Sequence, residues 1–169
     1  GLCVWTSTAG GPPKDISFSR PLLAWQNGRH VAYAGLSGGH MACVDARTGE
    51  ALWRFPMCTG GMSSTAVLYQ DTLIAIHGKE NLDTSTGGRM VAIKLGAEPK
   101  PGEKQLVLGK EHEVWRNDLT AFTSSPVLVG NRVYTTVATG ELACVDADTG
   151  KILWQHKLAP DQIHASPAY

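Results

Sequence analysis

The feature that most constrains the fold of this chain is a sequence repeat. Residues 41–53 and 142–154 align without a gap and share most of their residues, including an Asp-x-x-Thr-Gly turn and a closing Trp. A looser copy uses residues 90–94 and 113–115, where an insertion, residues 95–112, replaces the Thr-Gly turn. A second marker, a short apolar strand that often opens with Ser and Pro, recurs in the same order. Repetition at about 40 residues is typical of an array of similar structural units.

Each unit is predicted to be a sheet of four short strands. In the last unit, apolar or alternating segments lie at residues 126–129, 132–137, 142–145 and 152–154, and turn residues separate them. β-Branched and aromatic residues favour the strands, and Gly, Asn and Asp favour the turns. Four antiparallel strands in about 40 residues predict a blade of a β-propeller. A sandwich or a single barrel is the alternative all-β fold, but neither requires such a repeat.

The repeats divide the chain into three full blades and two flanking strands. Because a propeller needs about four to eight blades to close, we expect one partial propeller domain over residues 1–169, which is a segment of a longer protein cut inside blades at both ends. The expected boundaries are residues 1–5 for the last strand of a preceding blade, 16–53, 62–115 and 122–154 for the three blades, and 163–169 for the first strand of a following blade.

Charge and hydropathy exclude two classes of partner. Fifteen Lys and Arg residues balance fifteen Asp and Glu residues, so the formal net charge is zero. Nucleic-acid binding relies on a basic excess that displaces counterions, and a polybasic membrane anchor needs the same excess. The chain has no run of apolar residues long enough for a transmembrane helix. We therefore expect no nucleic acid partner and no transmembrane segment.

The spacing Cys-x-Asp-x-x-Thr-Gly-x-x-x-Trp, at residues 43–53 and 144–154, resembles the tryptophan-docking repeat of PQQ-like (pyrroloquinoline quinone) β-propellers. The resemblance implies that each closing Trp packs on the Gly turn of a neighbouring blade, and we expect Trp53 and Trp154 to be largely buried. The looser copy lacks the Asp and the Thr-Gly turn, which leaves the docking of Trp115 open. The structural docking residues implied by the resemblance are Trp5, Trp53, Trp115, Trp154, Gly49, Gly150, Asp45 and Asp146.

The same resemblance bears on function. The enzymes of the family, quinoprotein dehydrogenases, hold PQQ against a Trp floor, often beneath a disulfide between adjacent Cys residues and beside a Ca²⁺ ion. This chain has no adjacent Cys pair, and its one Trp outside the docking positions, Trp25, is expected in a turn and exposed or on an edge. We therefore expect a non-catalytic scaffold without a cofactor, which joins the remaining blades of its propeller and binds a protein or small ligand at one rim. The non-catalytic members, such as the β-barrel assembly lipoprotein, are the nearer functional class.

Two enzyme hypotheses stay open at this stage. The chain is alternatively a fragment of a PQQ-dependent dehydrogenase whose PQQ and Ca²⁺ lie mostly in blades outside it. A third hypothesis is an enzyme of another class that uses the propeller as a scaffold, because a fold does not fix a function. A periplasmic or cell-surface location in a bacterium is implied by the resemblance alone.

Polar residues gather in loops that are expected to share one rim of the propeller. Asn and Asp also favour solvated turns, so a loop without a ligand is the simpler interpretation. Carboxylate and amide oxygens are ligands of Ca²⁺, and two His residues could meet as metal ligands across a channel. An Arg and an Asp two positions apart are expected to form an ion pair rather than an acid–base pair. The rim candidates are His77, Glu80, Asn81, Asp83, Arg116, Asp118 and His164.

The four cysteines fall into two groups. Cys43 and Cys144 occupy one repeat position, where a small buried apolar residue is expected. Cys3 lies in an apolar segment and is interpreted in the same way. Cys58 lies in a Gly-rich loop and is the one thiol whose reactivity deserves a test.

Overall fold

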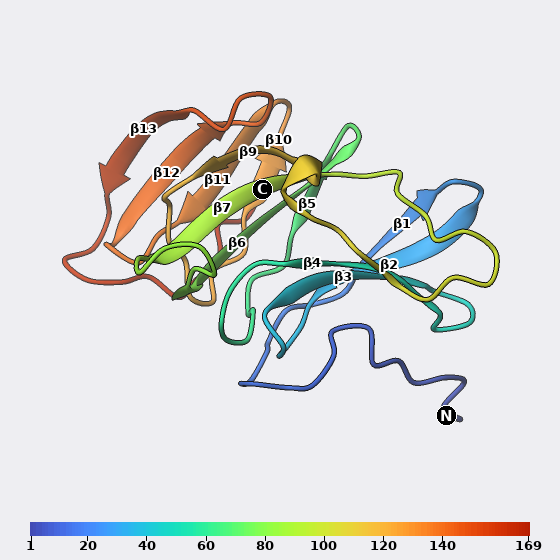
Figure 1. Ribbon diagram of the computed structural model, residues 1–169. Coiled ribbons are helices and arrows are strands. Elements are labelled where there is room, and N and C mark those ends of the chain that lie inside the picture. Colours follow the sequence, from blue (N-terminus) through green and yellow to red (C-terminus); the bar gives the residue numbers. More distant parts are fainter.

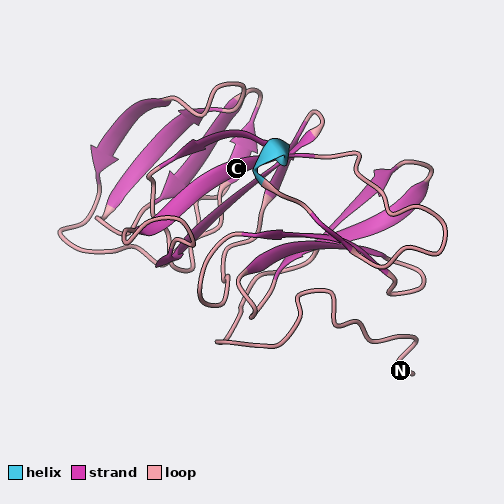
Figure 2. Ribbon diagram, viewed as in Figure 1, coloured by secondary structure: helices cyan, strands magenta, loops and turns pink.

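A computed structural model describes all 169 residues and contains three β-sheets and one turn of 3₁₀ helix (Figures 1 and 2). The all-β class is therefore confirmed. None of its helical segments has the length and hydropathy to cross a bilayer. The first sheet contains β1 (Leu22–Gln26), β2 (Arg29–Gly35), β3 (His40–Asp45) and β4 (Ala51–Pro56). The middle sheet contains β5 (Val67–Tyr69), β6 (Thr72–Glu80), β7 (Gly87–Lys94) and β9 (Glu113–Asn117). The third sheet contains β10 (Val127–Val129), β11 (Arg132–Thr136), β12 (Glu141–Asp146) and β13 (Ile152–Lys157).

The sequence repeat is also a repeat of strand register. In each sheet the four strands pair antiparallel in chain order. Cys43 lies opposite Trp53 in the first sheet, and Cys144 lies opposite Trp154 in the third. The register of the last strand pair shifts directly after each of these cysteines, and the middle sheet has the same shift after Ala92. Such an irregularity increases the local twist and re-aims the strand that follows.

The turn between the third and fourth strands follows from its sequence. The carboxylate of Asp45 accepts hydrogen bonds from the backbone N–H groups of Arg47 and Thr48, at 2.9 and 3.0 Å. Gly49 then adopts a φ of 76°, a left-handed conformation that costs little only for glycine. Asp146 and Gly150 repeat this arrangement in the third sheet, where φ of the glycine is 72°. The Asp-x-x-Thr-Gly spacing therefore specifies the backbone conformation of this turn.

Two apolar layers separate the three sheets. Along β6, Leu73 and Ala75 pack into the layer shared with the first sheet, while Ile74 and Ile76 pack into the layer shared with the third. This alternation follows from the two-residue period of a strand. The middle sheet is consequently apolar on both faces, which explains the near-continuous apolar run of β6 and β7.

The insertion at residues 95–112, here called the strap, crosses from the middle sheet to the first sheet and back (Figure 1). Its short strand β8 (Leu106–Val107) pairs in parallel with β4 and makes the first sheet five-stranded. The 3₁₀ turn η1 (Lys110–His112) then leads into β9. The amide of Gln105 donates to the carbonyl of Ala9 at 2.7 Å, which ties the strap to the N-terminal segment.

Three local expectations differ from the structure. Neither residues 1–5 nor residues 163–169 form a strand, because no neighbouring strand pairs with either segment. Trp25 lies in strand β1 rather than in a turn, and it is 65% exposed. Its ring and that of His30 form a T-shaped pair with centroids 4.7 Å apart, so Trp25 does pack at a sheet edge.

Candidate functional site

Two tryptophans lie directly on glycine turns. The indole N–H of Trp115, at the end of the middle sheet, donates to the carbonyl of Ala147 at 2.9 Å. A Cβ atom on Gly150 would come within 2.4 Å of that ring. Trp5 makes the same arrangement with the first sheet: its indole N–H donates to a turn carbonyl at 3.2 Å, and a Cβ on Gly49 would lie 2.5 Å from the ring. The bare backbone of glycine is therefore required for both contacts.

The other two repeat tryptophans behave differently. Trp53 is 1% exposed, but the middle sheet has no Thr-Gly turn, and the strap covers Trp53 through its pairing with Leu106. Trp154 is 44% exposed, so the expectation that it is largely buried is wrong. The reason is that no other sheet packs on its face of the third sheet. Trp115, whose docking the sequence left open, is 8% exposed and docked.

A cavity of about 240 Å³ lies between the first and middle sheets. Strand β4, the loop after β6, β7, the strap and β9 all contribute to its walls. One side is apolar and buried, since Met57, Val91 and Leu108 are 4%, 2% and 3% exposed. The lining residues are Phe55, Pro56, Met57, Leu82, Asp83, Arg89, Val91, Leu108, Gly109, Lys110, Glu113 and Arg116.

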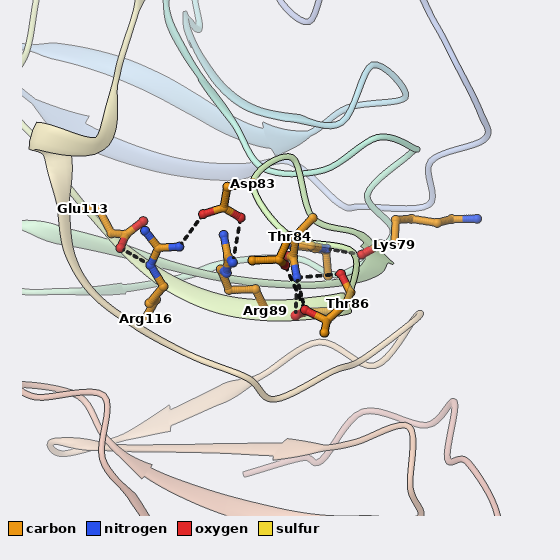
Figure 3. Close-up of polar contacts among 10 residues, drawn as sticks. Lys79, Asp83, Thr84, Thr86, Arg89, Glu113 and Arg116 are labelled. Atoms are coloured by element: carbon orange, nitrogen blue, oxygen red, sulfur yellow. Dashed lines mark hydrogen bonds and ion pairs between the residues drawn. The ribbon is translucent and has the colours of Figure 1, made fainter.

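An ion-pair network forms the polar side of this cavity (Figure 3). Asp83 bridges two guanidinium groups: Oδ1 lies 2.8 Å from Nη2 of Arg89, and Oδ2 lies 2.7 Å from Nη1 of Arg116. Nε of Arg116 also donates to the carboxylate of Glu113. Hydrogen bonds from Arg89 and Arg116 hold the pKa of Asp83 far below its ordinary value. The carboxylate of Asp83 is therefore ionised at any physiological pH.

Arg89 is the most deeply placed charge of the network. The residue is 9% exposed, and it lies at the start of β7 opposite His77 of β6. Its Nε atom is buried and has no hydrogen-bond partner within the protein. Buried charged groups are costly unless their polar atoms are paired, so Arg89 retains a donor that a bound group could satisfy.

The loop that carries Asp83 is held by Asn81. The side-chain amide of Asn81 donates to the carbonyl of Thr86 at 2.8 Å and to the carbonyl of Gly88 at 3.3 Å. Its backbone forms an isolated bridge to Cys58 of the loop after β4. Asn81 is 5% exposed, so it acts as a brace for the loop and is not placed as a metal ligand.

The remaining rim candidates do not come together with the network. Glu80 and Asp118 are exposed, and Arg116 pairs with Asp83 rather than with Asp118. The expected pair of Arg116 and Asp118 is therefore wrong: Asp83, from a distant loop, lies within reach of the guanidinium. His164 is exposed and contacts the hydroxyl of Thr123 at 2.8 Å.

His77 is not available as a ligand at a rim. It is 1% exposed within β6, and its Nδ1 lies 3.1 Å from the carbonyl of Lys79. Burial lowers the pKa of His77 to about 4, so the ring is neutral at pH 7. It does not meet His164, and no group of three or more His, Cys, Asp or Glu side chains is arranged to hold a metal ion.

The cysteine expectations need two corrections. Cys58 is 1% exposed, and burial raises the pKa of its thiol, so it is not placed as a reactive group. Cys3 is exposed rather than buried, because residues 1–5 do not join a sheet. Cys43 and Cys144 are both 1% exposed, as the repeat position predicts, and burial raises the pKa of Cys43 to about 12.

Sequence reasoning identified Asp83 and Arg116 at this site but missed Arg89 and the residues of the strap. The signal for Arg89 was a cation placed directly before the apolar run of residues 90–93. Glu113 was considered only as part of the repeat, and Lys110 and Leu108 lie inside the insertion. The pairing of β8 with β4 brings these strap residues to the cavity.

One comparison with known proteins identifies the type of repeat in part of the chain, and another concerns the fold. Residues 106–169 match the family model of the PQQ-like repeat described as outer membrane protein assembly factor BamB. A search of curated protein sequences found no match. The crystal structure of BamB from Moraxella catarrhalis aligns over 80% of this chain with a TM-score of 0.54 and 18% identity. The computationally designed Ika4 protein aligns over 87% of this chain and 78% of its own, with a TM-score of 0.56 and 15% identity. This chain spans 35% of the BamB chain, and likeness at these identities concerns the fold.

Proposed function

Because the chain carries repeats of the PQQ-like family, we propose that its three sheets are three blades of a β-propeller and that it acts as a non-catalytic scaffold. In this proposal the cavity between the first and middle sheets is the rim site at which a protein partner binds. The match to an outer membrane protein assembly factor supports a protein as the partner. The same match supports an extracytoplasmic location for the protein.

The observation that carries the proposal is the state of the charged groups at the cavity. Asp83 is held by two guanidinium groups, and Glu113 is held by Arg116. A general base must be free to accept a proton near the working pH. An ionised carboxylate in a fixed ion-pair network is poorly suited to that role, whereas a rigid charged wall beside an apolar wall is suited to binding.

A photo-crosslinking experiment tests where the partner binds. A photoreactive phenylalanine analogue is placed at Leu82, which lines the cavity and is 53% exposed, and the protein is expressed in its native host. The matched control carries the analogue at Leu23, which is 70% exposed on β1 and outside the cavity. We expect a specific crosslinked protein from position 82 and none from position 23.

Affinity measurements then decide whether the crosslink reports binding. The crosslinked partner is purified and titrated against the wild-type protein and the variants Leu82→Glu and Leu23→Glu. We expect Leu82→Glu to weaken binding by about tenfold or more, since it removes an apolar contact and places a carboxylate that competes with the partner at the cavity, and Leu23→Glu to have little effect. Equal affinities for both variants would contradict the rim assignment. Saturable binding of PQQ with Ca²⁺, followed by Trp fluorescence, would contradict the non-catalytic assignment.

A further inference from the structure

The lining of the cavity between the first and middle sheets is partly apolar and partly charged. Val91 and Leu108 form its buried apolar part, and Phe55 extends that part from β4. The charged groups of the network (Figure 3) line the same cavity directly beside Val91, which lies opposite Arg116 across β7 and β9. A bound group that fits both kinds of lining must have an apolar part and a polar part.

The charged part of the lining has an excess of positive charge. Three cationic side chains, Arg89, Arg116 and Lys110, line the cavity against two carboxylates, those of Asp83 and Glu113. The carboxylates of Asp83 and Glu113 are already paired with the guanidinium groups. Lys110, in contrast, is exposed and makes no ion pair with either carboxylate. The net field at the cavity therefore favours a ligand with one negative charge.

Arg89 also supplies a more specific reason for an anionic group. Only its Nη2 is engaged, by Asp83, and its buried Nε has no partner. A guanidinium presents its N–H groups in a planar fork that matches the two oxygens of a carboxylate. A carboxylate that reaches the Nε–Nη2 edge of Arg89 would satisfy the unpaired donor, and Nη2 can donate one proton to it and the other to Asp83.

We infer that this cavity binds an apolar side-chain-sized group that bears a carboxylate. The inference rests on the proposed function and names the chemistry that the rim site recognises. The volume, about 240 Å³, is below the roughly 300–1,000 Å³ of sites for drug-sized ligands, so one ring or branched chain fills it. The apolar part packs on Val91 and Leu108, and the carboxylate meets Arg89 and the exposed Lys110. Both a free carboxylic acid and the C-terminal residue of a peptide offer this chemistry.

The test compares acids with their uncharged amides. The probes are 3-phenylpropionate and 3-phenylpropionamide, and the peptides Gly-Gly-Phe with a free or an amidated C-terminus, titrated by calorimetry into the purified protein. We expect a saturable isotherm for the acids at concentrations below about 5 mM and binding about tenfold weaker for the amides, because a charge-assisted hydrogen bond is lost. The ratio of the affinities for the peptide acid and for 3-phenylpropionate shows whether the site prefers a peptide C-terminus or a free carboxylic acid.

Variants assign the binding to named groups. Arg89→Gln and Lys110→Gln should each weaken binding of the acids by about tenfold and leave the amides unaffected. Arg132→Gln is the matched control, since this arginine pairs with Asp146 at 2.7 Å in the third sheet, away from the cavity. If Arg89→Gln fails to fold, Lys110→Gln alone decides, because Lys110 is exposed and forms no ion pair.

Three results would overturn the inference: equal affinity for acid and amide, no saturable binding of either acid by folded protein, or unchanged affinity in Lys110→Gln. These results are separable from failure of the proposed function. If acids and amides bind alike while Leu82→Glu still loses the protein partner, the carboxylate inference fails and the rim assignment stands. If the acids are selected but Leu82→Glu keeps the protein partner, the rim assignment fails and the carboxylate site stands.

Discussion

At the residue scale, the glycine under each docked tryptophan is the position with the least freedom to change. Gly150 has a φ of 72°, and a Cβ atom would lie 2.4 Å from the ring of Trp115. Gly130 offers a matched control in the same sheet, since its φ is 60° but a Cβ would meet nothing within 4 Å. We expect Gly130→Ala to lower the free energy of unfolding by about 1–2 kcal/mol through backbone strain alone. Gly150→Ala should cost about 1–3 kcal/mol more, because it also displaces Trp115. Urea melts measure both, and equal costs would show that the ring contributes nothing at this turn.

The buried His77 predicts a pH dependence of stability. Its pKa is about 4 in the folded protein and about 6.5 when unfolded, so the unfolded chain binds more protons between these values. The contribution of the neutral ring is present above pH 6.5 and is lost as the pH falls toward 4. We expect a loss of about 2–3 kcal/mol from this group, measured by urea melts at several pH values. His77→Gln should flatten the profile over this interval; an unchanged slope in that variant would assign the effect to other groups.

At the element scale, the strap covers the ring of Trp53, as a glycine turn covers the ring of Trp115. Leu108 is 3% exposed in the same apolar layer as Trp53, whereas Val107, its neighbour in the strap, is 58% exposed. We expect Leu108→Ala to lower the free energy of unfolding by about 2–4 kcal/mol, and Val107→Ala by less than about 0.5 kcal/mol. Hydrogen exchange of β4 should rise in Leu108→Ala alone. Equal free energies of unfolding for the two variants would mean that the packing of the strap on the first sheet contributes little to stability.

The elements also show which features of the fold the sequence alone does not predict. The four-strand units are predictable because alternation and turn residues are local signals that recur in each repeat. Strand β8 is not predictable in this way, because two residues carry no measurable period and each pairs with a residue of β4 that lies 53 positions earlier, as Leu106 does with Trp53. The candidate site has the same division: Asp83, in the loop after β6, and Arg116, in β9, are residues that the repeat predicts at one rim. Arg89 and the strap residues join them only through tertiary pairing.

At the scale of the whole molecule, the sheets stack so that the middle sheet is covered on both faces and the outer sheets on one. The third sheet consequently exposes apolar side chains on β13, with Leu153 at 40% and Trp154 at 44%. Strand β13 also lies at the end of its sheet and leaves a row of backbone groups unpaired. Exposed apolar patches and open strand edges both promote association.

We therefore expect the purified 169-residue chain to self-associate at micromolar concentration through the face that carries Trp154. Light scattering should give a mass above the 18.0 kDa of one chain, and Trp154→Arg should shift it toward the monomer by placing a solvated charge on that face. The matched control is Trp25→Arg, which changes a 65% exposed tryptophan on β1 of the first sheet.

A wild-type chain that stays monomeric and melts cooperatively would show that three sheets are sufficient for a stable fold. An equal effect of both variants would show that association is general to exposed apolar residues and does not use β13. If only Trp154→Arg restores the monomer, the outer face of the third sheet is the surface through which the chain self-associates.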